Sequence, residues 1–159
     1  MVRHSLKVGL SFGLTSGIIT TLGLMVGMYS GTHDRYVVLG AIVTIAIADA
    51  LSDAMGIHIS EESECQHTDR EIWESTIATF LAKFLFASTF LIPVLLLPLQ
   101  HAIEVSIVWG LLVLSMLSWR MANTEHKRPW RVVAEHLFIA MAVISITNLT
   151  GKLVASVFG

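Results

Sequence analysis

The sequence has few of the residues on which most soluble enzymes and secreted domains depend. Cys65 is its only cysteine, which excludes an internal disulfide and a zinc site built from several cysteines. Charged residues make up only 14% of the 159 residues, and the formal net charge is -2. No basic tract interleaved with aromatic residues is present, so we do not expect nucleic acid as a partner. The histidines are scattered, without an H-E-x-x-H or nucleophile motif, so we do not expect an enzyme.

Apolar residues are abundant instead. Hydrophobic residues form 54% of the chain, and the mean hydropathy is +0.72, which is typical of an integral membrane protein. A helix needs about 20 mainly apolar residues to cross a bilayer. Residues 1–159 are therefore expected to form a single all-α transmembrane domain with five helices. The stretches that qualify are 7–29, 36–60, 76–98, 102–120 and 132–158.

The first of these stretches follows a basic start, so both a signal peptide and a retained span must be weighed. The apolar run continues to about Tyr29 without a small-residue cleavage pattern, which favours a retained span. Five spans place the termini on opposite sides of the membrane. Cationic residues gather on one side, at Arg3, Lys7, Arg70, Arg120, Lys127, Arg128 and Arg131.

Positive residues predominate in cytoplasmic loops. We therefore expect a cytoplasmic N-terminus, a short acidic cytoplasmic connector at 61–75 and a C-terminus outside the cell or in a lumen. The membrane would be the cell (inner) membrane in a prokaryote and a vacuole-like organelle membrane in a eukaryote.

The second span carries Asp49 and Asp53 in its interior. A carboxylate at membrane depth is costly unless a partner, a cation or a water-filled cavity stabilises it. Residues i and i+4 share one face of a helix, so the two carboxylates would lie about 6 Å apart along the axis. We interpret this face as the lining of a cation path.

Acidic residues continue directly from this span into the connector. Glu61, Glu62 and Glu64 are followed by three more acids before residue 75, with Arg70 as the only cation. One interpretation is a solvated hairpin that its acids keep soluble. The other, which we favour for the first three glutamates, is an electrostatic funnel that concentrates divalent cations at the mouth of the path.

Lys83 in the third span competes with a metal ion as the partner of the aspartates. Lys83 and Asp53 lie at a similar depth, about two turns from the same surface, so they could form a structural ion pair that offsets the desolvation of both charges. In that case Asp49 would be the better ligand candidate. Snorkelling of Lys83 to the interface is a third possibility.

The first span contains two sets of glycines at four-residue spacing: Gly9, Gly13 and Gly17, then Gly23, Gly27 and Gly31. Small residues at this interval allow close helix packing in lipid, against another helix of the chain or a symmetry mate. Ser16 and Thr20 add hydroxyls to this span, and Met28 offers a thioether to a soft metal.

Several of these segments resemble the vacuolar iron transporter family. GLTSGIITTLGLMVGM (residues 13–28) is similar to its first-helix signature, G-x-N-D-G-[IVL]-[VIS]-[ST]-T-x-[GA]-L-V-x-G, and ADALSDAMGIHIS (residues 48–60) is similar to its second-helix run, A-G-A-L-S-M-A-x-G-E-Y-V-S. Segments of the third and last spans resemble the corresponding helices. The resemblance implies a homodimer, joined through the glycine-rich first helix. It also implies export of Fe(II) or Mn(II) from the cytoplasm in exchange for protons, along a path at the subunit interface, with no prosthetic group.

Departures from the family pattern fall on the metal ligands. Ser16 stands where the family has Asp, Asp53 where it has Met, Ile57 where it has Glu, and Asn148 where it has Tyr. The long glutamate-rich cytoplasmic helices of the family are reduced here to 61–75. Oxygen ligands in place of a thioether shift the preference toward harder ions such as Mn(II), or make the preference for metal ions broader.

Two hypotheses of function follow. The first is a divalent metal transporter whose metal ligands come from Asp49, Asp53, Glu61, Glu62, Glu64, Ser16, Thr20 and Met28. The second is a membrane scaffold or interaction module that transports nothing, in which Asp53 and Lys83 form a structural pair.

Overall fold

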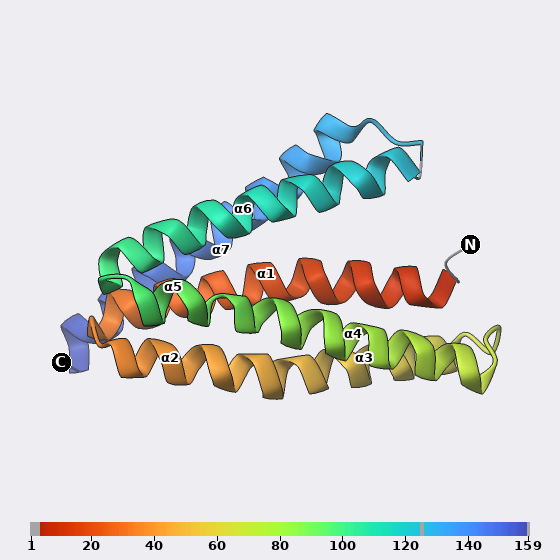
Figure 1. Ribbon diagram of the computed structural model, residues 1–159, viewed down its shortest axis with the longest axis horizontal. Coiled ribbons are helices and arrows are strands. Elements are labelled where there is room, and N and C mark those ends of the chain that lie inside the picture. Colours follow the sequence, from red (N-terminus) through yellow and green to blue (C-terminus); the bar gives the residue numbers. More distant parts are fainter. Residues whose placement is uncertain (1–3, 125, 159) are drawn as a thin grey trace.

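The computed structural model describes residues 4–124 and 126–158, and all the regular structure in these two ranges is helical (Figure 1). The elements in chain order are α1 (His4–Thr32), α2 (Arg35–Thr44), η1 (Ile45–Asp49), α3 (Ala50–Ser63), α4 (Asp69–Thr89), α5 (Leu91–Leu96), α6 (Leu99–Thr124) and α7 (Pro129–Phe158).

The described residues contain five helical segments that are long and apolar enough to cross a membrane, as the hydropathy pattern predicts. They run over Ser5–Thr32, Arg35–Ser63, Asp69–Leu96, Leu99–Thr124 and Pro129–Phe158. Each is longer than the stretch expected from hydropathy alone, because the helices continue into residues that flank the apolar stretches.

Local capping explains where the helices begin. The Asp34 carboxylate accepts hydrogen bonds from the backbone N–H groups of Tyr36 (2.6 Å) and Val37 (3.2 Å) at the start of α2. Thr68 and Glu71 form a reciprocal capping box at the start of α4. The predicted connector at 61–75 is therefore too long, since only residues 64–68 lie between α3 and α4.

Two of the spans are interrupted. The second span contains a π-helical turn, η1, between α2 and α3. The third breaks at Phe90, between α4 and α5. Pro93 explains this break, because it has no N–H to donate to the carbonyl of Thr89 four residues earlier.

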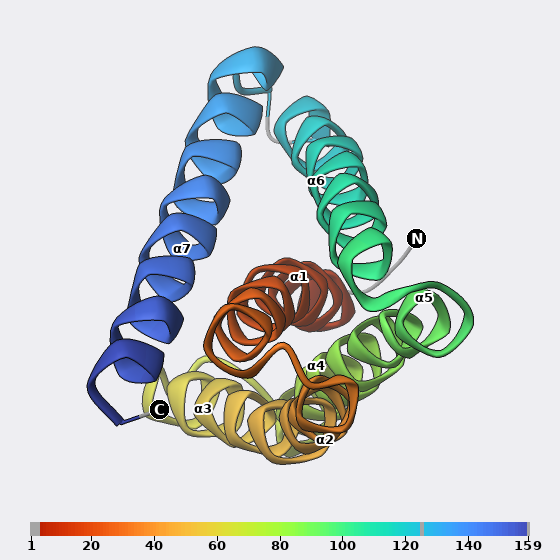
Figure 2. The ribbon, with the colours of Figure 1, turned by 90° about the vertical axis from the view of Figure 1, so that its left-hand side faces the viewer.

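The first helix lies at the centre of the bundle (Figure 2), where it packs most extensively on α4 and α7. The start of α1, the α3–α4 turn and the α6–α7 turn all lie at one end, and the C-terminus lies at the other (Figure 1). This arrangement places the predicted cytoplasmic segments at one end of the molecule. Which side of a membrane that end faces stays a prediction.

Glycines of α1 allow both of these close contacts. A Cβ at Gly13 would lie 2.5 Å from the carbonyl oxygen of Thr79 in α4, and a Cβ at Gly27 would lie 3.3 Å from that of Thr147 in α7. The neighbouring glycines of each set meet the same two helices in the same four-residue register. The glycines expected at a dimer interface are thus already packed against helices of their own chain.

Candidate functional site

The polar centre of the bundle is built around Lys83 of α4, whose side chain is fully buried. Gly17 of α1 makes room for its aliphatic stem, since a Cβ at this position would lie 3.2 Å from Cγ of Lys83. A buried ammonium in an apolar bundle requires acceptors for its charge and for its three N–H donors.

Three side chains, from η1, α3 and α1, surround this ammonium. The Nζ of Lys83 lies 2.5 Å from Oδ2 of Asp49, at the end of η1, and forms a second ion pair with Oδ2 of Asp53 in α3. It also donates to Oγ of Ser16 in α1, at 2.9 Å. The Ser16 hydroxyl in turn donates to Oδ2 of Asp53, at 2.6 Å. We call these four residues the Lys83 cluster.

The charges of the Lys83 cluster do not balance. Two carboxylates face one ammonium, and both carboxylates use Oδ2 for this contact. The side chain of Asp49 keeps 32% of its surface exposed and that of Asp53 keeps 21%, whereas Lys83 keeps none. The two carboxylate side chains therefore reach the surface of the chain, whereas the lysine side chain is completely buried.

The π-helical turn η1 ends at Asp49, the first of the two carboxylate residues of the Lys83 cluster. Turns of this kind are rare, occur mostly as single-turn bulges in α-helices and are frequent at functional sites. Because Asp49 and Asp53 then follow in ordinary α-helical spacing, they share one face as the sequence predicts. No sequence signal that we recognise identifies the π-helical turn itself.

The interpretation of Lys83 from the sequence is partly wrong. The ion pair with Asp53 is present, but it does not leave Asp49 aside, because the same ammonium contacts both carboxylates. Snorkelling is also excluded by the complete burial of the lysine.

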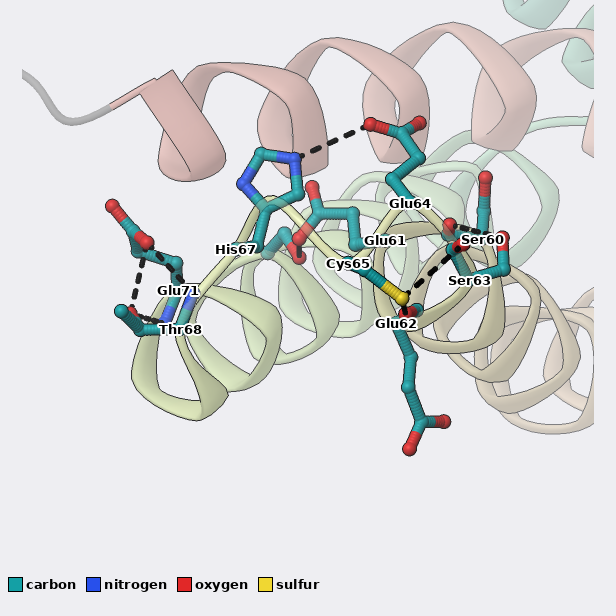
Figure 3. A network of polar contacts seen from close by, with 10 residues as sticks. Ser60, Glu61, Glu62, Ser63, Glu64, Cys65, His67, Thr68 and Glu71 are labelled. Carbon is teal, nitrogen blue, oxygen red and sulfur yellow. Dashed lines mark hydrogen bonds and ion pairs between the residues drawn. The ribbon is translucent and has the colours of Figure 1, made fainter.

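The three glutamates expected to form a funnel do not converge. Glu61 is buried and accepts a hydrogen bond of 2.5 Å from the Ser75 hydroxyl. Glu64 pairs with His67, with 3.4 Å between Oε2 and Nε2. Figure 3 shows Glu62 and Glu64 pointing in opposite directions. Glu61 follows Asp53 by about 12 Å along α3, so these acids do not join the Lys83 cluster.

The remaining ligand candidates have other positions. Thr20 donates its hydroxyl to the carbonyl of Ser16, 2.9 Å away in the same helix. Met28 is about 18 Å further along α1 than Ser16, where it lines an apolar groove of about 460 Å³ between α1 and α7. Asn148 accepts a hydrogen bond of 2.5 Å from Ser30 and so joins α7 to α1.

No group of three or more His, Cys, Asp or Glu side chains in residues 4–124 and 126–158 is placed to hold a metal ion. The strongest concentration of potential oxygen ligands in the spans is the pair Asp49 and Asp53 with the Ser16 hydroxyl. A cation that bound there would meet the Lys83 ammonium, so the two positive charges would compete for the same carboxylates.

Comparison with known proteins gives no match to a protein-family model and none to a curated protein. The likeness to the vacuolar iron transporter family therefore rests on the sequence segments quoted above.

Proposed function

We propose that the chain is a secondary transporter that moves a divalent metal cation, Fe(II) or Mn(II), out of the cytoplasm in exchange for protons. The observation that supports it most is the excess of carboxylate over ammonium in the Lys83 cluster. An uncompensated carboxylate in a membrane span is expensive and is a functional feature by default. The identity of the ion and the direction of transport come from the resemblance.

Lys83 acts in this proposal as the resident cation of the metal-free state. Its ammonium offsets one of the two carboxylate charges, so one negative charge of the cluster is left for the exchanged ions. A metal ion that approaches Asp49 and Asp53 from their exposed side weakens the hold of both carboxylates on the ammonium. Exchange follows because a carboxylate oxygen cannot bind a proton and a metal ion at once.

The exposed side of the cluster also supports the proposed homodimer. One stripe of α1 at four-residue spacing is not fully covered by the other helices: Phe12, Ser16, Thr20, Leu24 and Met28. This stripe contains Ser16 of the cluster together with Thr20 and Met28. A second copy of the chain on this side would cover the carboxylates and enclose a path between two first helices.

The test is metal uptake by proteoliposomes that contain the purified protein. We expect wild-type protein to take up radiolabelled Fe(II) or Mn(II) when a pH gradient is imposed, and Asp49→Asn to abolish uptake. This variant should still fold, because Lys83 keeps its ion pair with Asp53. Glu104→Gln, which removes an exposed carboxylate at the other end of the bundle, is the matched control and should transport normally. Wild-type rates from Asp49→Asn, or no uptake by the wild type, would contradict the proposal.

A second candidate is the membrane scaffold, and one specific observation favours it. Lys83 donates hydrogen bonds to Asp53 and Ser16 and forms an ion pair with Asp49, so its charge is compensated within the chain without any further ligand. In this candidate, the Lys83 cluster serves to join α1, α3 and α4.

A charge swap distinguishes the two candidates. If the pair is structural, Asp53→Lys with Lys83→Asp should restore folding that either single substitution impairs, and Mn(II) should leave the melting temperature of the wild type unchanged. A transporter that binds Mn(II) in its folded state is stabilised by an amount that grows with the logarithm of the Mn(II) concentration above the dissociation constant, so its melting temperature rises as Mn(II) is added.

A further inference from the structure

A strongly basic hollow lies at the end of the α6–α7 hairpin. It has a volume of about 930 Å³ and is formed by the last turns of α6, the connection and the first two turns of α7. We call it the basic recess. Its polar lining consists of His126, Lys127, Arg128, Arg131, Glu135 and His136.

Cations dominate the basic recess. Among the described residues of its lining, three carry a permanent positive charge and one, Glu135, carries a carboxylate. Among the described residues, neither Arg128 nor Arg131 has a carboxylate within ion-pair distance, although Arg131 lies over the ring of Trp130, with Cζ 5.3 Å from the ring centroid. Two guanidinium groups are therefore available to an anion. The forked geometry of guanidinium suits two oxygens of one phosphate group.

The surroundings of the basic recess suit the headgroup of a lipid. The recess joins two membrane-spanning helices at their ends, and Trp119 and Trp130 on either side of the connection are exposed by 50% and 60%. Exposed tryptophans mark the membrane–water interface. Beyond them toward the bundle centre, α6 and α7 expose Met116 and Phe138 by 64% and 76%. An acyl chain could lie along these apolar side chains while its phosphate enters the recess.

We propose that the basic recess binds the headgroup of an anionic phospholipid from the leaflet that borders this end of the bundle. The phosphate would be held by the guanidinium groups of Arg128 and Arg131. His136 would border it in a fixed orientation, because its Nδ1 lies 2.7 Å from the Ser118 hydroxyl. The binding is independent of metal transport, so the inference does not rest on the proposed function.

The experiment measures binding of dihexanoyl phosphatidylglycerol to the purified full chain in a neutral detergent. Dihexanoyl phosphatidylcholine and inorganic phosphate serve as separate probes. We expect Arg128→Gln with Arg131→Gln to weaken phosphatidylglycerol binding on the order of 25-fold, since each cation near an anionic surface contributes about fivefold. Arg128→Lys with Arg131→Lys should retain most of the binding.

Arg120→Gln is the matched control, because Arg120 is an exposed cation at the same end of α6 that does not line the recess. It should change binding less than twofold. Equal losses in Arg120→Gln and the recess variant would mean diffuse attraction to the surface and would overturn the proposal. So would phosphatidylcholine binding as tightly as phosphatidylglycerol, or inorganic phosphate competing at the same concentration as the lipid. An unchanged elution volume in size-exclusion chromatography shows that the glutamine and lysine variants are folded. If the folded lysine variant loses binding as the glutamine variant does, the proposed phosphate contact is wrong.

Discussion

The Nζ of Lys83 lies 2.5 Å from Oδ2 of Asp49, although the two residues belong to different spans and the lysine has no exposed surface. The same ammonium forms an ion pair with Asp53. A single buried cation thus contacts two carboxylates that the sequence places one helical turn apart, and the stability of the bundle should depend on it.

Replacing Lys83 by methionine should destabilise the protein strongly. The substitution keeps the length of the side chain but leaves Asp49 and Asp53 as neighbouring carboxylates without a cation. Removal of one partner from a buried ion pair costs about 3–5 kcal/mol. Unfolding of the purified protein in detergent, followed by tryptophan fluorescence, measures the change. Lys152→Met, at an exposed lysine of α7, should unfold like the wild type.

A second substitution tests the cause of this effect. Asp53→Asn removes one of the two carboxylates, so its addition to Lys83→Met should recover part of the lost stability, which is a coupling that a double-mutant cycle detects. Strict additivity of the two changes would show that the residues do not interact.

Gly13→Ala should separate α1 from α4. The new Cβ would lie 2.5 Å from the carbonyl oxygen of Thr79 and 3.1 Å from Cβ of Ala82, so backbone must move. Overpacking of this kind costs about 1–3 kcal/mol. Gly40→Ala is the control, because apart from its chain neighbours and the backbone of its own helix no atom lies within 4 Å of its Cβ position. Alanine also favours a helix over glycine by about 1 kcal/mol. The thermal stability should fall for the first variant and stay equal or rise for the second.

The hydrogen bond from Ser30 to Asn148 should contribute measurably to the packing of α1 on α7. The donor and acceptor lie 2.5 Å apart, and Ser30 is buried. Hydrogen bonds between transmembrane helices contribute about 0.6 kcal/mol on average and up to about 1.7. A double-mutant cycle of Ser30→Ala and Asn148→Ala should give a coupling in this range. A coupling of zero would mean that the bond does not form in the membrane.

Labelling of Cys65 tests the orientation without any substitution. This cysteine is exposed in the turn between α3 and α4 and is the only one in the chain. The positive residues predict that this turn is cytoplasmic. A maleimide that does not cross membranes should therefore label inside-out vesicles and leave intact cells unlabelled. Labelling of intact cells would reverse the predicted orientation.

Hydropathy and charge were sufficient for the five spans, since a helix that crosses lipid must be long and apolar whatever its neighbours are. The boundaries were less accurate, because capping by Thr68 and Glu71 extends helices into polar residues that hydropathy assigns to a loop. The pair Asp49 and Asp53 could also be found from the sequence, because charge in an apolar stretch is conspicuous and four-residue spacing fixes a shared face.

The partners of these residues depend on how the helices pack. Periodicity along one helix does not reveal which glycine set meets α4 and which meets α7, nor that Lys83 reaches both aspartates past Gly17. The glutamates after Ser60 looked like one group because they are adjacent in sequence. Successive helical residues point about 100° apart, however, so Glu61 is buried against Ser75 while Glu62 faces outward. The sequence by itself determined that charged residues lie within long apolar helices. Only the tertiary structure decided which groups those charges meet, because contacts between helices depend on the packing of side chains distant in the chain.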